Sequence, residues 1–165
     1  MKKTYSGSWK PKNLAKYKGD PNKIKYRSLW ERNAFRDLDT ASWVKWWNSE
    51  ETVIGYICAT DNKPHRYFVD LTIRTDSGRT LLVEIKPHAQ TQPPKRKKLN
   101  EALTYMKNTS KWKYAQKFCD ERGYEFQIWT EHELEAMGVK TLSMKMKASK
   151  TKVGKRIWKS LKKRV

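Results

Sequence analysis

The chain has 165 residues, of which 33% are charged and 37% hydrophobic, so it is long enough to bury the core of one domain. It carries 37 Lys and Arg residues against 17 Asp and Glu residues, a formal net charge of +20 at pH 7. No apolar run approaches the ~18 residues of a membrane span, and none follows Met1, so neither a membrane span nor a signal peptide is predicted. The two cysteines, Cys58 and Cys119, form neither a CxxC pair nor a disulfide framework, which favours a reducing compartment.

The positive charge is concentrated at the two ends of the chain. Residues 1–27 have a net charge of +8 and residues 140–165 a net charge of +11, whereas residues 28–139 have a net charge of +1. We therefore predict a basic, aromatic arm, an α/β domain and a basic, disordered tail. Such arms are typical of proteins that bind polyanions, and we favour nucleic acid over an anionic membrane surface.

The predicted arm combines aromatic residues with lysines and helix-breaking residues. Pro11 and Pro21 argue against a helix, so the arm is predicted to be extended. Trp9 and Tyr17 lie among lysines and have two interpretations. They either stack on nucleic acid or attach the arm to the core, and the pattern does not decide between the two.

A helix is predicted to begin after Ser28 and to end near Asp39. The spacing Ser28-x-x-Glu31 is a capping box, in which each side chain accepts a hydrogen bond from a free backbone amide. Ala34 and Leu38 follow at helical spacing. Glu31 has two interpretations: it is a structural cap, or it is an acid that contacts a metal-bound water.

Apolar, β-branched and aromatic segments then predict four strands. Asp76-Ser77-Gly78 is a turn signal, so the last two strands should form a β-hairpin. Pro87 should end the fourth strand because proline donates no backbone hydrogen bond. The four predicted strands are residues 42–47, 52–58, 66–73 and 81–87.

The second half of the chain is predicted to be mostly helical. A helical pattern covers residues 95–122, and Asn108-Thr109-Ser110 should break it into two helices. A strand at 125–129 and a short helix capped by Thr130 follow. The resulting order, α-β-β-β-β-α-α-β-α, predicts an α/β fold with a mixed central sheet flanked by helices.

The predicted hairpin contains acidic residues at strand positions. Side chains alternate across a strand, so Tyr67 and Asp70 should lie on opposite faces, while Glu84 and Lys86 share a face. Pairing of the two strands would bring Asp70, Glu84 and Lys86 together. Burying two carboxylates is costly unless something pairs them, and a divalent cation would do so. The alternative is a simple ion pair of Lys86 with either acid on a solvated face.

This set of residues is suited to hydrolysis of a phosphodiester. Mg²⁺ prefers oxygen ligands, so Asp70 and Glu84 would hold it, with the Ile85 carbonyl as a third ligand and Glu31 acting through a bound water. Lys86 would stabilise the negative charge of the transition state. Basic residues near this site are candidate contacts to the DNA backbone, namely Arg27, Lys95, Arg96, Lys97 and Lys98.

Other catalytic motifs are weak or absent in the sequence. The three histidines are scattered, so a zinc site is disfavoured, although the combination of Cys58, His65 and His88 stays open. There is no Gly-x-Ser-x-Gly motif and no glycine-rich phosphate loop.

Two groups of motifs resemble known nucleases. Glu31 on the first helix, Asp70 and Glu84-x-Lys86 together resemble the motif of the PD-(D/E)xK nuclease superfamily. Further motifs occur between residues 5 and 138, and through them the chain is similar to the head completion nucleases of T-even-type tailed phages. These motifs are Tyr5-Ser6-Gly7, Trp9-Lys10-Pro11-Lys12-Asn13, Gly19-Asp20-Pro21, Tyr26-Arg27-Ser28, Arg66-Tyr67-Phe68, Glu84-Ile85-Lys86-Pro87 and Thr91-Gln92-Pro93-Pro94.

The resemblance implies a fold, an activity and a biological setting. It implies a PD-(D/E)xK-like core and a Mg²⁺-dependent DNA nuclease, with Mn²⁺ as a substitute. It also makes Glu31 a site residue. It implies action in virion assembly, after DNA packaging and before head–tail joining, in the host cytoplasm or the virion. The implied partners are DNA and portal, neck or other head-assembly proteins, without a membrane.

Two rival functions stay open on the sequence alone. One is a non-catalytic DNA-binding head-completion protein, in which the acids only pair with lysines. The other is a branched-DNA resolvase or transposon-end endonuclease of the same fold. For the 140–165 tail, charge is the sole sequence feature from which a role can be inferred.

Overall fold

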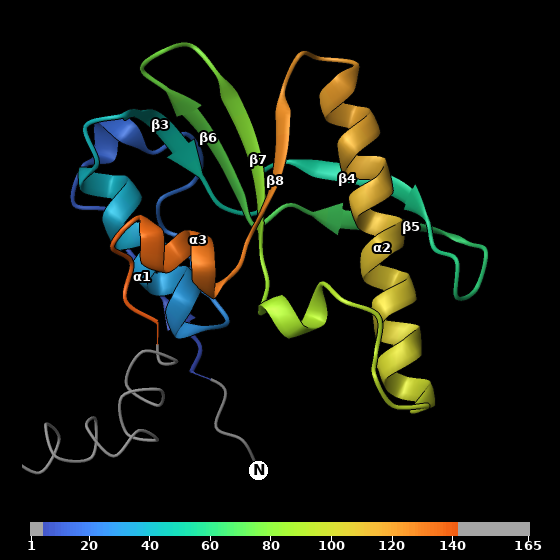
Figure 1. Ribbon diagram of the computed structural model, residues 1–165. Helices are drawn as coiled ribbons and strands as arrows, with labels where there is room; N and C mark the ends of the chain where they lie inside the picture. Colours follow the sequence, from blue (N-terminus) through green and yellow to red (C-terminus); the bar gives the residue numbers. More distant parts are fainter. Residues whose placement is uncertain (1–4, 142–165) are drawn as a thin grey trace, which may run out of the picture.

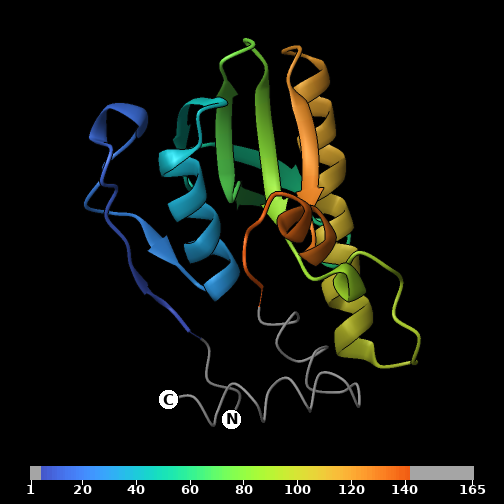
Figure 2. The ribbon, with the colours of Figure 1, turned by 60° about the vertical axis from the view of Figure 1, so that its left-hand side comes forward.

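A four-stranded sheet forms the centre of the molecule, with α1 (Leu29–Thr40) on one face and α2 (Leu99–Asp120) on the other (Figure 2). The computed structural model describes residues 5–141, so nearly all of the predicted basic tail lies outside the described residues. The sheet is mixed, which confirms the predicted fold class. Its strands, in spatial order, are β3 (Val44–Asn48), β6 (Leu71–Thr75), β7 (Thr80–Ile85) and β8 (Glu125–Trp129).

The described part of the N-terminal arm packs against the sheet and α1. Its short strands β1 (Gly7–Ser8) and β2 (Lys25–Tyr26) pair, and a 3₁₀ turn, η1 (Leu14–Lys16), lies between them. Trp9 contacts Trp47 with 5.6 Å between ring centroids, and Tyr17 contacts the same indole at 5.0 Å. Trp9 and Tyr17 therefore attach the arm to the core, which decides between their two interpretations.

A buried carboxylate also anchors the arm to α1. Asp39 is 2% exposed. Its Oδ2 accepts hydrogen bonds from the Lys12 amide at 2.9 Å and the Asn13 amide at 3.2 Å. The end of α1 therefore satisfies two backbone donors of a segment that has no sheet partner at that point.

Replacing Asp39 with Ala is expected to lower the free energy of unfolding by about 1–3 kcal/mol, because two backbone amides would lose a charged acceptor. Urea denaturation would measure this loss. Asp37→Ala is the matched control, since none of the described hydrogen bonds involves its carboxylate. Equal losses in the two variants would contradict the anchoring role of Asp39.

The predicted strand at 66–73 is wrong, because the structure divides this segment into two strands. β5 (Pro64–Phe68) pairs with β4 (Val53–Ile57) in a separate two-stranded sheet, whereas β6 pairs with β3 and β7. The chain changes sheet at Val69 and Asp70. The backbone of Val69 bonds to Glu50 and Thr52 in the β3–β4 loop, at 3.1 and 3.0 Å, which removes it from the β6 ladder.

The predicted break at 108–110 is also wrong, because α2 is continuous through these residues. Thr109 Oγ1 and Ser110 Oγ donate to the Tyr105 and Met106 carbonyls of the preceding turn, at 3.0 and 2.9 Å. The hydroxyls therefore bond back within the helix and do not cap a new one. The observed order is α-β-β-β-β-β-α-β-α after the arm, with one more strand and one helix fewer than predicted.

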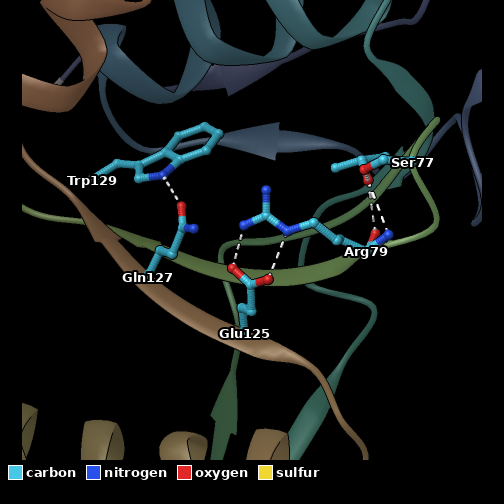
Figure 3. Close-up of polar contacts among 6 residues, drawn as sticks. Ser77, Arg79, Glu125, Gln127 and Trp129 are labelled. Carbon is cyan, nitrogen blue, oxygen red and sulfur yellow. Dashed lines mark hydrogen bonds and ion pairs between the residues drawn. The ribbon is translucent and has the colours of Figure 1, made fainter.

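β7 is one of the two interior strands of this sheet, and all six of its residues are buried. Leu81, Val83 and Ile85 pack with α1, whereas Leu82 packs with the α2 side. β8 runs parallel to β7. Where β7 and β8 begin, Arg79 Nε donates to Glu125 Oε1 at 2.6 Å (Figure 3). This guanidinium lowers the pKa of Glu125.

A short helix, α3 (Glu131–Ala136), follows β8 on the same side of the sheet as α1 (Figure 1). Thr130 and Glu133 form the capping box that begins it, as the sequence predicts. Of the helices in residues 5–141, none combines the length and the apolar character needed to cross a membrane.

Candidate active site

The two acidic residues of the predicted hairpin meet at the point where the chain changes sheet. Asp70 lies in the link between β5 and β6, and its Oδ2 accepts a hydrogen bond from the Ile85 amide at 2.8 Å. Glu84, on β7, is 2% exposed. Burial, followed by the negative charge of Glu84, raises the pKa of Asp70 well above its usual value. The two carboxylates therefore repel each other inside the protein.

Lys86 joins this pair from the end of β7. Its Nζ lies 3.0 Å from Glu84 Oε1. Burial lowers the pKa of Lys86, but the charges of Glu84 and Asp70 outweigh that effect and the net shift is upward. One ammonium thus faces two carboxylates on a largely buried surface, so the solvated ion pair considered from the sequence does not describe this site.

Glu31 lies at the start of α1 and acts both as a cap and as a neighbour of the carboxylates. Its oxygens accept hydrogen bonds from the Arg27 amide at 2.8 Å and from Ser28 Oγ at 3.0 Å. Burial raises the pKa of Glu31, and its charge raises the pKa values of both Asp70 and Lys86. Its two interpretations are therefore compatible.

Glu31 also opens onto a surface hollow. This hollow has a volume of about 380 Å³ and is lined by Glu31, Ile85 and Lys86, among other residues. The Ile85 amide points to Asp70. Because the N–H and C=O of one strand residue point to the same side, the Ile85 carbonyl faces that side too. We refer to this space as the catalytic hollow, after the candidate site that it adjoins; Asp70 and Glu84 themselves do not line it.

Two residues that were not among the predicted site residues also belong to this site. Tyr67 Oη donates to Glu84 Oε2 at 2.6 Å, and Lys111 Nζ lies 5.4 Å from the centre of the Tyr67 ring. Burial lowers the pKa of Lys111, which is coupled to the charges of Glu84, Lys86 and Asp70. The site therefore contains two lysines, one from β7 and one from α2.

Comparison with known proteins places the chain in a family. The profile described as TnsA-like endonuclease N terminal matches residues 41–131, which include Asp70, Glu84, Lys86 and Lys111. The chain belongs to the TnsA-like endonuclease family. It is also 44% identical, over 146 residues, to the head completion nuclease of Enterobacteria phage T4, an alignment that covers 82% of this chain and 97% of that protein.

A divalent metal ion is the usual cofactor of nucleases of this kind, and the residues present fit such an ion. Asp70 and Glu84 are close, and only one lysine forms an ion pair with them among the described residues. Burial and the charge of Glu84 raise the pKa of Asp70, so a nearby cation would favour the ionised form of this carboxyl. The carboxylate oxygens of Asp70 and Glu84 are ligands of the kind that hard divalent ions prefer.

Of the two missed residues, only Lys111 had a signal in the sequence. Tyr67 was assigned to the face opposite Asp70, and this holds only if one strand continues through Val69. Lys111 lies four residues before Ala115, which is fully buried, so it falls on the stripe of α2 that faces the sheet. A lysine on a buried stripe is unusual and is a usable signal for a site residue.

Replacing Tyr67 with Phe is expected to reduce the cleavage rate about tenfold, because the bond that orients the Glu84 carboxylate would be lost. Single-turnover cleavage at saturating enzyme would measure the loss. Tyr56→Phe is the matched control, since Tyr56 is buried on the same two-stranded sheet but stacks near His65. If both variants cleave at the wild-type rate, Tyr67 does not position Glu84.

The candidate DNA contacts lie around the catalytic hollow and before α2. Arg27 lines the hollow and forms an ion pair with Glu50, while its side chain stays 65% exposed. The other four candidates are exposed in the loop that precedes α2, and Lys98 lies 3.2 Å from Glu101. All five positively charged groups are therefore accessible to a polyanion.

The zinc combination left open by the sequence does not form as stated. Cys58 and His65 do gather at the end of the β4–β5 hairpin, but the third member is Asp61. Asp61 Oδ2 lies 2.8 Å from His65 Nε2, and Cys58 Sγ lies 3.0 Å from Thr60 Oγ1, so these groups have protein partners. His88 instead lies near His132, with 5.2 Å between the rings.

Proposed function

We propose that this chain is a Mg²⁺-dependent DNA endonuclease that hydrolyses phosphodiester bonds, with Mn²⁺ as a substitute. The observation that supports the proposal most directly is the geometry of the two carboxylates: Ile85 N–H donates to Asp70 Oδ2 at 2.8 Å, and Lys86 Nζ lies 3.0 Å from Glu84 Oε1. Buried like charges are costly unless a cation compensates them, and sites that retain such a cost are often functional.

The ligands of the ion in this proposal are Asp70, Glu84 and the Ile85 carbonyl, with Glu31 acting through a bound water. When bound, the ion would polarise the phosphoryl group and activate water. Lys86 would stabilise the extra negative charge of the transition state, and Lys111 would hold a non-bridging phosphate oxygen from the α2 side. Tyr67 would keep the Glu84 carboxylate in one orientation.

The basic residues around the site would position the DNA backbone. Arg27 would act at the catalytic hollow, and the group before α2 would act further along the strand, namely Lys95, Arg96, Lys97 and Lys98. Contacts of this kind carry no sequence information, so binding should weaken steeply with salt and depend little on sequence.

The biological setting follows from the T4 relative. We propose that the chain acts in phage head completion, after DNA packaging and before head–tail joining, in the host cytoplasm or on the virion. Portal or neck proteins would then be its protein partners. The 44% identity over 146 residues to a head completion nuclease supports the head-completion part of this proposal.

A second candidate is cleavage at branched DNA or at transposon ends. The match of residues 41–131 to the TnsA-like profile favours it as an alternative. Cleavage confined to junctions or to defined end sequences would support this candidate, whereas cleavage of any linear end would support head completion.

Removal of divalent ions tests the proposed activity. Wild-type protein treated with EDTA is expected to lose cleavage of linear, circular and single-stranded DNA, and Mg²⁺ or Mn²⁺ should restore it. Agarose gels would measure breaks through both strands of the duplex, and denaturing gels would measure breaks in either strand. Absence of cleavage of every DNA form with either ion would contradict the enzyme and favour the non-catalytic DNA-binding protein.

A further inference from the structure

A second, larger hollow adjoins the catalytic hollow. It has a volume of about 820 Å³ and lies between the η2 segment (His88–Gln90) and the first half of α2. In Figure 1 the chain runs from β7 through η2 and a loop to the start of α2. Gln90 lines both hollows, and Lys86 of the catalytic hollow is only two residues from His88 of the second, so the two spaces lie on either side of the η2 segment. The volume is within the range of small-molecule sites, and is enough for a nucleotide.

The lining of this second hollow differs from that of a phosphate site. It combines Pro93, Pro94 and the ring of Tyr105 with the carboxamides of Gln90 and Asn108. Its only cation among the described residues is Lys95, and two glutamates also border it. Apolar walls with a few amide groups suit the flat, neutral surface and polar edge of a nucleobase better than a phosphate.

Asn108 is the polar group that lies deepest in this lining. It is 5% exposed and lines the hollow, yet its carboxamide has no hydrogen-bond partner within residues 5–141. The carboxamide therefore offers one acceptor and two donors to a ligand in the hollow. Asn108 also lies one helical turn before Lys111, which belongs to the catalytic cluster.

Building on the proposed nuclease activity, we propose that the second hollow receives an unpaired base next to the scissile phosphate, with Asn108 bonding its edge and Tyr105 contacting its face. We refer to it as the base pocket. A base in an intact duplex is stacked and paired and cannot enter such a pocket. Single-stranded or frayed DNA is therefore the preferred substrate.

Abasic sites distinguish the contribution of a base to binding from that of the phosphate charge. Single-stranded oligonucleotides with one abasic site, moved stepwise along the strand, keep the same charge as the intact strand. Their affinity for wild-type protein would be measured by fluorescence anisotropy in EDTA, where no cleavage is expected. We expect about a tenfold loss at one position and little change elsewhere. Equal affinity of all the oligonucleotides would overturn the proposal.

Variants of the lining assign the effect to the pocket. Asn108→Ala should remove most of the abasic penalty and leave duplex affinity within about twofold, since duplex DNA contacts only the phosphate-binding residues. Gln116→Ala is the matched control, because Gln116 is exposed on the same helix and bonds Asp120. Tyr105→Leu is the second variant if Asn108→Ala does not fold. Equal loss of single-strand and duplex affinity in the folded variant would overturn the assignment.

The binding assay keeps this inference distinct from the proposed activity. If the abasic penalty occurs but no DNA form is cleaved with Mg²⁺ or Mn²⁺, the base pocket stands and the nuclease proposal fails. If cleavage occurs on single strands and intact duplex at equal rates and no abasic penalty exists, the nuclease stands and the base pocket is overturned.

Discussion

Replacing Asp70 with Asn is expected to reduce DNA cleavage by a factor on the order of 10²–10³, while DNA affinity changes by less than about twofold. The amide keeps the shape of the side chain and can still accept the hydrogen bond from the Ile85 amide. It removes the negative charge that a metal ion would need. Single-turnover cleavage with Mg²⁺ and anisotropy in EDTA would measure the two quantities separately.

The same variant is expected to be more thermally stable than the wild type in the absence of metal. Burial and Glu84 raise the pKa of Asp70 above its unfolded value, so the native state resists deprotonation of this carboxyl. Above the raised pKa the charged carboxylate therefore destabilises the native state, and this cost is lost progressively as pH falls from the raised pKa to the unfolded pKa. Removing the charge should raise Tm by about 2–4 °C for each kcal/mol relieved.

Asp76→Asn is the matched control for Asp70→Asn, because Asp76 is exposed in the β6–β7 turn. The control should cleave DNA normally and keep its Tm. If Asp70 were only the partner of a lysine, its replacement would lower Tm and leave cleavage intact. That pair of results would contradict the metal site.

Replacing Lys86 with Met is expected to affect stability in the opposite direction. Cleavage should fall on the order of 10²–10³-fold, since the ammonium that would stabilise the transition state is lost. Glu84 would then remain buried without its ion pair, which is 3.0 Å long in the native protein. Because the Lys86 side chain is 25% exposed, we expect a loss of about 2–3 kcal/mol, less than for a fully buried pair.

Two further variants make the Lys86 result interpretable. Lys86→Arg keeps the charge and should restore most of the stability but little of the cleavage, because the planar guanidinium places its donors differently. Lys45→Met is the control, as Lys45 is exposed on β3. Assays at 25 °C, with folding checked by circular dichroism, would separate lost chemistry from unfolding. Wild-type cleavage by folded Lys86→Met protein would remove Lys86 from the mechanism.

Local sequence patterns were sufficient for the elements whose ends are encoded by neighbouring residues. Ser28 and Thr130 cap α1 and α3 as predicted, because a cap requires only residues within one turn. The β6–β7 hairpin forms around Gly78, whose φ of 89° suits glycine. The pairing of these strands also brings Asp70 to Glu84, so alternation within a strand predicted the centre of the candidate site.

Only the tertiary structure decided the features that depend on distant contacts. The chain leaves its strand at Val69 because Glu50 and Thr52 hold that backbone, and the change of sheet turns Tyr67 toward Glu84. Lys111 reaches the same carboxylates because α2 packs across the sheet, and neither its own segment nor β7 encodes that packing. Short-range periodicity records which face a residue occupies within one element. It contains no information on where two elements meet, which is set by the burial of their apolar surfaces.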